Sequence, residues 1–308
     1  MTMKTDFTLS RRQFLGRTAT LAAAAATSPG TLVNAAPTDK KLPWKFCAFE
    51  KPLLFLSYDE TADFMAELGF DGIEAAVRPG GHVLPERVEE DLPKFVEALK
   101  KRGLEITILT SGINSVEQPH TEKVLRTAAK LGIQRYRMLW YRYDLKKNIV
   151  GQLEAFRTGL KDLVTLNREI GISGLYQNHA GAEMLGASLW DIYDLVKGHA
   201  PKDIGIAYDT RHAQVEAGQS WTTQFQLIKS HVTSVFVKDF IWEKNKVVSV
   251  PLGAGRVDKK IMNLVKEANF TGPISLHVEY SEDKKDRKFF AEAFRKDFAT
   301  LKEWLKTA

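Results

Sequence analysis

The chain has 308 residues, of which 44% are hydrophobic, and a formal net charge of +6 at neutral pH. This length is enough for one large core. Without residues 1–35 the net charge is +3, from 40 basic and 37 acidic residues. So mild a charge does not favour a nucleic-acid partner. The single cysteine, Cys47, excludes an intramolecular disulfide and is expected to be a small buried residue.

The N-terminal residues follow the order of an export signal. Ser10-Arg11-Arg12-Gln13-Phe14-Leu15 resembles the twin-arginine signal, and a mild apolar run from Thr18 to Ala26 follows it. Val33-Asn34-Ala35 offers small residues that suit signal peptidase, and the apolar run is too short to span a membrane. We therefore expect a signal peptide over 1–35, a linker over 36–43, and a periplasmic or secreted protein without a membrane anchor after processing.

From Trp44 onward, short apolar runs alternate with segments of helical period. The predicted strands are 45–49, 72–76, 106–109, 136–140, a fifth that ends at Gln177, 204–208, 235–237 and 274–276. The predicted helices are 60–68, one through Leu92 and Leu99, one through Val124 and Leu131, 149–170, one through Leu189 and Val196, 221–229, one with Asp258 as its N-cap, and one from Phe290 to Leu305. Glycines that suit helix C-termini follow four of these helices, at Gly69, Gly103, Gly132 and Gly171.

Eight strand–helix pairs in this order predict a (β/α)8 TIM barrel, with residues 44–308 as its single domain. The competing fold is a doubly wound open sheet. It is less favoured because it normally has fewer strands and because no G-x-G-x-x-G turn follows the first predicted strand.

Polar side chains gather at the C-terminal ends of the predicted strands, where a TIM barrel builds its active site. They are Glu50, Glu74, His82, Gln177, His179, Asp209, His212, Lys238, Asp239, His277 and Glu279. Because side chains alternate along a strand, Gln177 and His179 share one side, and so do His277 and Glu279. Such a cluster of carboxylates and imidazoles can hold a divalent cation or supply general acids and bases.

Two other features near the predicted strand ends allow more than one interpretation. Trp140 and Trp242 lie nearest the predicted mouth, where an aromatic face can stack on a sugar ring, although most tryptophans are packing residues. The segment Gly253-Ala254-Gly255 could approach a phosphate with its backbone amides. A tight turn before a helix explains the same two glycines equally well.

Four segments together resemble the xylose isomerase-like TIM barrel superfamily, which includes sugar isomerases, sugar epimerases, inosose dehydratases and endonuclease IV. The segments are Tyr208–His212, Val237–Asp239, Pro251–Asp258 and Gly272–Glu279, within a resemblance that covers residues 44–306. Residues 78–85 and 176–179 also resemble a secreted subgroup of this superfamily.

The resemblance implies metal ligands at four strand ends, and this chain departs from that pattern. Asp209 matches the usual aspartate, but Gln177 and His277 stand where the superfamily usually has glutamates, and Phe236 stands where it usually has a histidine. A divalent metal (Mn, Zn, Co or Mg) could still be held by Gln177, Asp209 and His277, with His179 or Glu279 nearby. No nucleotide cofactor is expected.

Residues and resemblance together predict a sugar isomerase or epimerase that moves a proton or hydride next to a carbonyl. Glu279 or His277 facing His179 would form the acid/base pair, and Lys238 or a metal on Asp209 would polarise the oxygen. The predicted catalytic residues are Glu279, His179, His212 and Lys238. The predicted substrate contacts are Glu50, Glu74, His82, Trp140, Asn178 and Trp242.

Three alternatives remain open at this stage. The first is a lyase or hydratase that acts on an oxidised (keto) sugar. The second is a non-catalytic periplasmic carbohydrate-binding protein, suggested by the altered ligand set. The third, an enzyme of the endonuclease IV type, is disfavoured by the mild charge and by Phe236. The expected partner is therefore a small carbohydrate and not a nucleic acid, and the sequence leaves the oligomeric state open.

Overall fold

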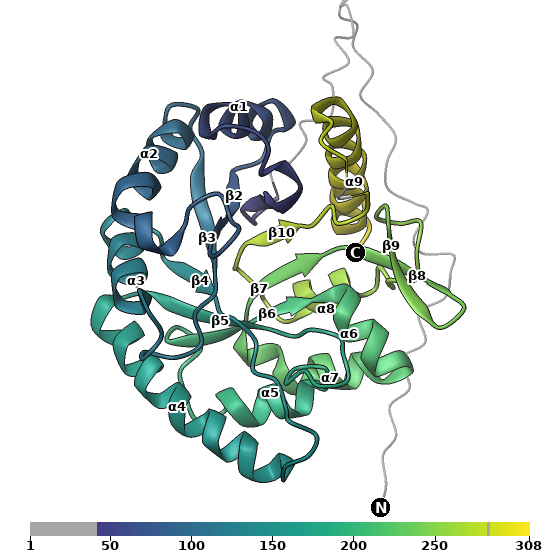
Figure 1. Ribbon diagram of the computed structural model, residues 1–308. Helices are drawn as coiled ribbons and strands as arrows, with labels where there is room; N and C mark the ends of the chain where they lie inside the picture. The colour runs from purple at the N-terminus through teal and green to yellow at the C-terminus, as the bar shows by residue number, and fades with distance from the viewer. Residues whose placement is uncertain (1–41, 282–283) are drawn as a thin grey trace, which may run out of the picture. The chain divides into compact units, whose positions relative to one another are not determined.

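The computed structural model describes residues 42–281 and 284–308, and from Pro43 to Ala308 the chain forms one compact unit. The expected signal peptide and most of the expected linker lie outside the described residues. Eight parallel strands close into a barrel in the order β1-β10-β7-β6-β5-β4-β3-β2, which confirms the TIM barrel (Figure 1). They are β1 (Phe46–Phe49), β2 (Gly72–Val77), β3 (Glu105–Ser111), β4 (Arg135–Arg137), β5 (Ser173–Gln177), β6 (Ile204–Asp209), β7 (Val232–Val237) and β10 (Ile274–Leu276).

Helices connect the strands and surround the barrel (Figure 1). They are α1 (Tyr58–Leu68), α2 (Val88–Lys100), α3 (Thr121–Lys130), α4 (Ile149–Ile170), α5 (Leu189–Val196), α6 (Thr210–Ala217), α7 (Trp221–Ile228), α8 (Ile261–Glu267) and α9 (Arg287–Thr307). Helix α1 begins with a capping box between Ser57 and Glu60 and ends at Gly69, whose φ of 78° is the left-handed conformation that glycine adopts at low cost. No helix in the described part of the chain has the length and apolar character needed to cross a bilayer.

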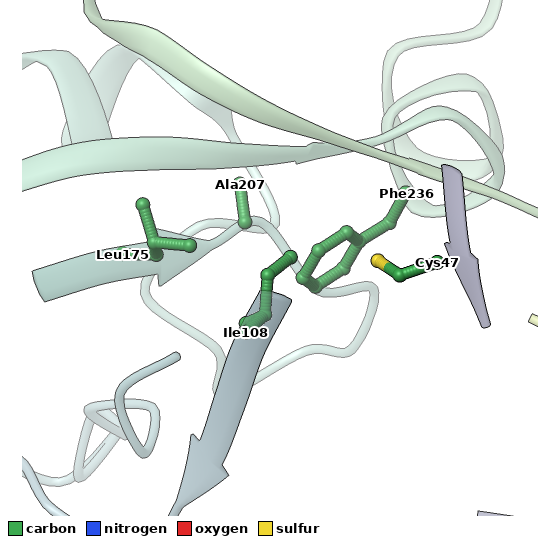
Figure 2. Close-up of a cluster of buried hydrophobic side chains, with 5 residues drawn as sticks. All are labelled: Cys47, Ile108, Leu175, Ala207 and Phe236. Carbon is green, nitrogen blue, oxygen red and sulfur yellow. The ribbon is translucent and has the colours of Figure 1, made fainter. Parts of the chain in front are cut away.

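The barrel interior is filled by apolar side chains from alternate positions of the strands. Figure 2 shows one such cluster, in which Cys47, Ile108, Leu175, Ala207 and Phe236 point toward one another, and all five are fully buried. The prediction that the cysteine is a core residue is confirmed, and burial raises the pKa of its thiol, so it stays protonated. Close packing of this layer means that a ligand can reach the barrel only at an open end.

An antiparallel hairpin, which the sequence analysis did not predict, follows β7 directly. It consists of β8 (Asp239–Glu243) and β9 (Lys246–Val250) and projects from the barrel in Figure 1. Both strands are rich in β-branched and aromatic residues, as strands usually are. The turn between them lacks the glycine that usually marks a two-residue hairpin, and Lys244 adopts a positive φ of 56° instead.

The structure differs from the predicted elements at three places near the strand ends that carry polar residues. Residues 210–217 form helix α6 rather than a loop, because the Asp209 carboxylate accepts a hydrogen bond from the backbone amide of His212 and so caps a helix. Strand β4 ends at Arg137, so Trp140 belongs to the loop that follows it. Helix α8 begins at Ile261, because the Asp258 carboxylate accepts from the amide of Lys260 in a turn that precedes the helix.

Candidate active site

A cavity of about 240 Å³ opens at the C-terminal ends of the barrel strands. Its lining residues are Phe49, Lys51, Arg78, Arg137, Trp140, Gln177, His179, Arg211, His212, Lys238, Ser249, His277 and Glu279. All of them come from a strand end or from the segment just after it, except Ser249, which the β8–β9 hairpin supplies. The location is the one that the TIM barrel architecture predicts for an active site.

Most residues selected from the sequence gather at this cavity. Seven line it: Trp140, Gln177, His179, His212, Lys238, His277 and Glu279. The candidate metal ligand Asp209 is fully buried next to the lining, where its carboxylate contacts Gln177 and Lys238. Asp239 and five of the predicted substrate contacts also lie outside the lining; the five are Glu50, Glu74, His82, Asn178 and Trp242.

The placement of these five residues does not fit the prediction that they contact a substrate. Glu50 is completely buried and bonds to His82 and to the amide of Ala76. Asn178 donates to the backbone carbonyl of Asp209 and accepts from its amide, so it holds the end of β6 in place. Trp242 lies on the hairpin with 43% of its surface exposed.

Glu74, the fifth of these residues, lies outside the lining but contacts His277, which lines the cavity. Its carboxylate is completely buried and accepts hydrogen bonds from Thr110 and Ser275. It also bonds to Nε2 of His277 at 2.8 Å. Burial alone would raise the pKa of Glu74, but His277, Arg137 and Thr110 together outweigh burial and the net shift is downward. The carboxylate therefore stays ionised and orients an imidazole that does line the cavity.

His277 is held in one orientation and has one free ring nitrogen. Its ring packs between Phe49 and Phe236, with centroid distances of 4.9 and 4.7 Å. Nδ1 is buried, has no hydrogen-bond partner among the described residues, and lies 3.9 Å from Oε2 of Glu279. Burial would lower the pKa of His277, but the carboxylates of Glu74 and Glu279 raise it above the ordinary value. A protonated imidazole with an open N–H is the form of a general acid.

Lys238 joins two carboxylates at the wall of the cavity. Its ammonium nitrogen lies 2.5 Å from Oε2 of Glu279 and 3.2 Å from Oδ2 of Asp209. Burial would lower the pKa of the lysine, but these two carboxylates raise it instead. The ammonium in turn holds the pKa of Glu279 well below its usual range. Lys238 is therefore a fixed positive charge in a largely dehydrated place, where charge acts most strongly.

His179 and His212 lie ring against ring in a tilted arrangement on another side of the cavity. The two imidazole centroids are 3.9 Å apart, and His179 also lies 4.4 Å from the ring of Trp140. Burial, and then the charge of Lys238, lower the pKa of His179 to about 4. Its Nδ1 lies 2.9 Å from the carbonyl oxygen of Ala180, so the neutral ring carries its hydrogen there and keeps a lone pair on Nε2. This is the form of a general base.

Arg137 lines the cavity and is not among the residues selected from the sequence. Its guanidinium donates to Oε1 of Gln177 at 2.7 Å and lies 4.8 Å from the ring of Trp140. Burial lowers its pKa to about 10, so it remains charged at neutral pH. The available signal is that Arg137 is the single charged residue in the predicted strand 136–140, because burying a charge is costly unless it is paired or used.

The three predicted metal ligands do not fit a divalent cation. The Gln177 oxygen accepts from Arg137, and its amide nitrogen faces Asp209. Nε2 of His277 is committed to Glu74, and the ammonium of Lys238 lies against Asp209. Within residues 42–281 and 284–308, no group of three or more His, Cys, Asp or Glu side chains has the arrangement of a metal site. An ammonium group lies against the carboxylates that would have to hold the metal.

The glycine-containing loop after β9 wraps around Asp239. Oδ2 of this carboxylate accepts from the amides of Gly253 and Gly255, and Oδ1 accepts from the amides of Val257 and Phe240. A Cβ at Gly255 would lie 2.3 Å from Oδ1, so only glycine allows the backbone to approach so closely. These amides are therefore used inside the protein, which favours the turn interpretation over a phosphate site.

Solved structures share this fold at low sequence identity. A D-psicose 3-epimerase from Clostridium cellulolyticum H10, solved with D-tagatose, is 13% identical with a TM-score of 0.66, over 85% of this chain and 99% of its own. The IolI protein with a bound zinc atom is 15% identical with a TM-score of 0.69, over 85% and 98%. The probable 3-DHS dehydratase AsbF from Bacillus anthracis is 16% identical with a TM-score of 0.63, over 84% and 97%. At these identities the likeness establishes the fold alone.

The sequence itself gives one match at the level of a family. Residues 62–306 match the family described as xylose isomerase-like TIM barrel. No curated protein matches the chain. The family match spans most of the barrel and includes every strand except β1.

Proposed function

The chain belongs to the xylose isomerase-like TIM barrel family, and from that premise we propose that it is a carbohydrate isomerase or epimerase that transfers a proton next to a carbonyl. One observation carries the proposal. Two histidines whose pKa values are shifted in opposite directions, His179 downward and His277 upward, line the same cavity as the buried ammonium of Lys238. A base, an acid and a fixed positive charge are the three groups that enolisation of a sugar needs.

The two histidines reach the cavity from different parts of the barrel. His277 follows β10 and His179 follows β5, and strands β7 and β6 stand between them in the ring. A sugar carbon between them can therefore lose a proton to Nε2 of His179 and regain one from Nδ1 of His277. Return of the proton to the opposite face of the same carbon gives epimerisation, and return to the neighbouring carbon gives isomerisation.

Lys238 stabilises the charge that develops during this transfer. When the carbon loses its proton, negative charge moves to the carbonyl oxygen, and an ammonium group already fixed by Asp209 and Glu279 needs little reorganisation to receive it. We assign Glu279 to holding Lys238, because its Oε2 already accepts a hydrogen bond from the ammonium group. The positive charge at the oxygen is thus an ammonium in this proposal, since the donors expected for a metal are engaged elsewhere.

A lyase reaction on a keto sugar is the second candidate, because the free Nδ1 of His277 can also serve as the acid of an elimination. After His179 removes the proton, an acid at this position can protonate a hydroxyl group on the next carbon, which then leaves as water. One structure with the same fold is described as a probable dehydratase. A dehydration product contains a new conjugated double bond and absorbs ultraviolet light, whereas an isomer or epimer does not.

The twin-arginine segment supports the proposal that the protein works in the periplasm or outside the cell. Arg11 and Arg12 lie outside the described residues, so this part of the proposal rests on the sequence. Replacing both arginines with lysine is expected to hold the precursor in the cytoplasm. Mature protein in the periplasm of that double mutant would rule out this route of export.

Isotope exchange tests the proposed reaction whichever sugar product is formed. The protein is incubated in D2O with D-fructose, D-tagatose and their keto-acid counterparts, and proton NMR follows the hydrogens next to the carbonyl. Deuterium should enter at one such carbon in the presence of the wild-type protein, and exchange should be lost in His179→Asn. Saturable sugar binding with no exchange in any of the sugars would instead favour a non-catalytic carbohydrate-binding protein.

A further inference from the structure

The lining of the cavity has a strong excess of positive charge. Five lysine or arginine side chains contribute to it, and the single carboxylate in the lining is Glu279. The five are Lys51, Arg78, Arg137, Arg211 and Lys238. His277 adds to this charge whenever it is protonated, and its raised pKa favours that form. The proposed reaction on a neutral sugar requires one cation at the carbonyl oxygen and does not account for the others.

Three of these cations are compensated by carboxylates. Lys238 pairs with Asp209 and Glu279, and Lys51 lies 3.6 Å from Glu279. Arg137 lies 3.8 Å from Glu74. Arg78 and Arg211 differ from them, because neither has an ion pair within the part of the chain that the structure describes. Two uncompensated guanidinium groups therefore face the cavity.

The local structure fixes the backbone at both arginines. Arg78 directly follows β2, in a turn where its amide donates to the carbonyl of Val83, and its guanidinium lies over the ring of Phe49 at 5.7 Å. Arg211 is the second residue of α6, whose start is capped by Asp209. Strands β2 and β6 stand opposite each other in the eight-stranded ring. The two guanidinium groups thus enter the cavity from opposite walls.

Hydrogen-bond donors without acceptors line the same cavity. Nε of Arg211, Nε1 of Trp140 and Nδ1 of His277 are buried and have no partner in the described structure. Both ring nitrogens of His212 also lack a partner, and because burial holds the pKa of this ring well below its ordinary value, one of them is a donor and the other an acceptor. Burying a donor without an acceptor is costly, and more so when the donor is charged. Such a set is compensated by a ligand that brings several oxygen acceptors, at least one of them charged.

We infer that the natural substrate is an anionic carbohydrate whose charged oxygens are held by Arg211, with Arg78 adding positive charge from the opposite wall. This inference rests on the proposed function, because it names the substrate class of the same cavity. A guanidinium presents a planar fork of N–H groups that matches a carboxylate or a phosphate. A sugar acid and a sugar phosphate share this chemistry, and the experiment separates them.

Titration calorimetry with three matched sugars tests the inference: D-glucuronate, D-glucose 6-phosphate and D-glucose. Wild-type protein should bind one of the two anionic sugars more tightly than D-glucose, and rising NaCl should weaken that binding. Arg211→Gln should weaken it by about 10- to 100-fold, which is the range for hydrogen bonds to charged groups. Arg78→Gln should have a smaller effect, and Arg295→Gln, on the outer helix α9, should have none. A thermal melt of each variant confirms that it is folded.

The outcomes separate the inference from the proposed function. The stronger anionic ligand identifies the charged group as carboxylate or phosphate. Equal binding of all three sugars, no binding of any, or unchanged binding in Arg211→Gln would overturn the inference. If neutral ketoses exchange deuterium as fast as their acid counterparts, the anion site fails and the proposed function stands. If anionic sugars bind selectively and no sugar exchanges deuterium, the proposed function fails and the anion site stands.

Discussion

Two histidine–carboxylate pairs lie at the same end of the barrel. They differ in whether the second ring nitrogen of the histidine has a hydrogen-bond partner. In the pair of His82 and Glu50, Nδ1 lies 2.8 Å from the carboxylate and Nε2 lies 2.7 Å from the carbonyl oxygen of Leu56, so both ring nitrogens are engaged. In the pair of His277 and Glu74, Nε2 is engaged at the same distance of 2.8 Å, but Nδ1 is open. We call them the closed pair and the open pair.

Charge does not distinguish the two pairs. In each of them burial would lower the histidine pKa, and the neighbouring acceptors together outweigh burial and raise it: Glu50 and the Leu56 carbonyl for His82, Glu74 and Glu279 for His277. Both imidazoles are therefore disposed to be protonated, but only the open pair has an N–H that can reach a substrate. The comparison shows that an unoccupied ring nitrogen at a cavity separates a proton donor from a structural ion pair.

The largest difference is expected from replacing each histidine with glutamine. His277→Gln should lower kcat by about 10²- to 10⁴-fold per folded molecule, because the proton donor is lost. His82→Gln should lower the melting temperature and leave turnover per folded molecule close to that of the wild type. Steady-state turnover, divided by the concentration of folded protein, gives the first quantity, and a thermal melt gives the second. Equal loss of turnover in the two variants would contradict the distinction between the pairs.

Lys238 lies close to the open pair, because Oε2 of Glu279 is near both its ammonium group and Nδ1 of His277. Replacing it should have the next largest effect on turnover. Lys238→Met keeps most of the volume but removes the charge, and we expect kcat to fall by about 10²- to 10³-fold, as when a group that stabilises a developing oxyanion is lost. Because Asp209 and Glu279 then lose their cation, Lys238→Arg is the matched control for folding and should retain part of the activity. Unchanged turnover in Lys238→Met would remove the ammonium from the mechanism.

The pH dependence of turnover should respond to Glu74, the carboxylate of the open pair, and not to Glu50, the carboxylate of the closed pair. Turnover should fall below pH about 4 as His179 becomes protonated, and again as pH rises through the raised pKa of His277, which loses its proton there. Glu74, Glu279 and Lys238 all face His277, and Glu74 is the largest upward influence on its pKa. Glu74→Gln should therefore move the alkaline limb of the kcat profile to lower pH. A limb that stays in place would show that His277 is not the titrating acid.

Glu50→Gln is the matching change in the closed pair. The raised pKa of His82 means that this pair stabilises the fold below the unfolded pKa of histidine, and that the stabilisation is lost as pH rises through the folded pKa. The variant should lower the melting temperature most below about pH 6.5, the ordinary histidine pKa. The alkaline limb of turnover should stay where it is in the wild type. Melting curves across pH, measured beside the rate profile, test this expectation.

The smallest effect is expected from removing metal. Incubation with a chelator followed by gel filtration should leave turnover unchanged, because the donors around Asp209 are engaged by Gln177 and Lys238. Elemental analysis of the same samples measures any metal that remains. Loss of activity that Mn²⁺ or Zn²⁺ restores would contradict the assignment of the positive charge to Lys238.

The fold could be predicted from the sequence because its signals are local. Apolar runs of strand length alternate with helical periods, and glycines mark helix ends, as at Gly69 and Gly171, which both adopt a positive φ. The β8–β9 hairpin was missed because Lys244 occupies a turn position where glycine is usual. Helix α6 was missed because Asp209, its N-cap, was interpreted as a site carboxylate. In the structure its Oδ1 caps the helix, and its Oδ2 lies against the ammonium of Lys238.

The site could be predicted only in part. Seven of the residues selected at strand ends line the cavity. Arg78, Arg137 and Arg211 line it too, but an arginine at or just after a strand end is usually a solvated residue, so the sequence alone does not single them out. The sequence also could not distinguish the open pair from the closed pair. Their difference depends on Leu56, whose carbonyl occupies the second nitrogen of His82, and that contact is created only when the chain folds.

Nitrogen NMR of the histidine rings tests the central claim most directly, because it needs no substrate. The chain has seven histidines, so ¹⁵N-labelled protein gives a spectrum that single histidine variants can assign. At pH 7 the account predicts that His277 carries protons on both nitrogens and that His179 is neutral, with its proton on Nδ1. Finding both histidines in the same protonation state, or the proton of His179 on Nε2, would contradict the assignment of these residues as acid and base.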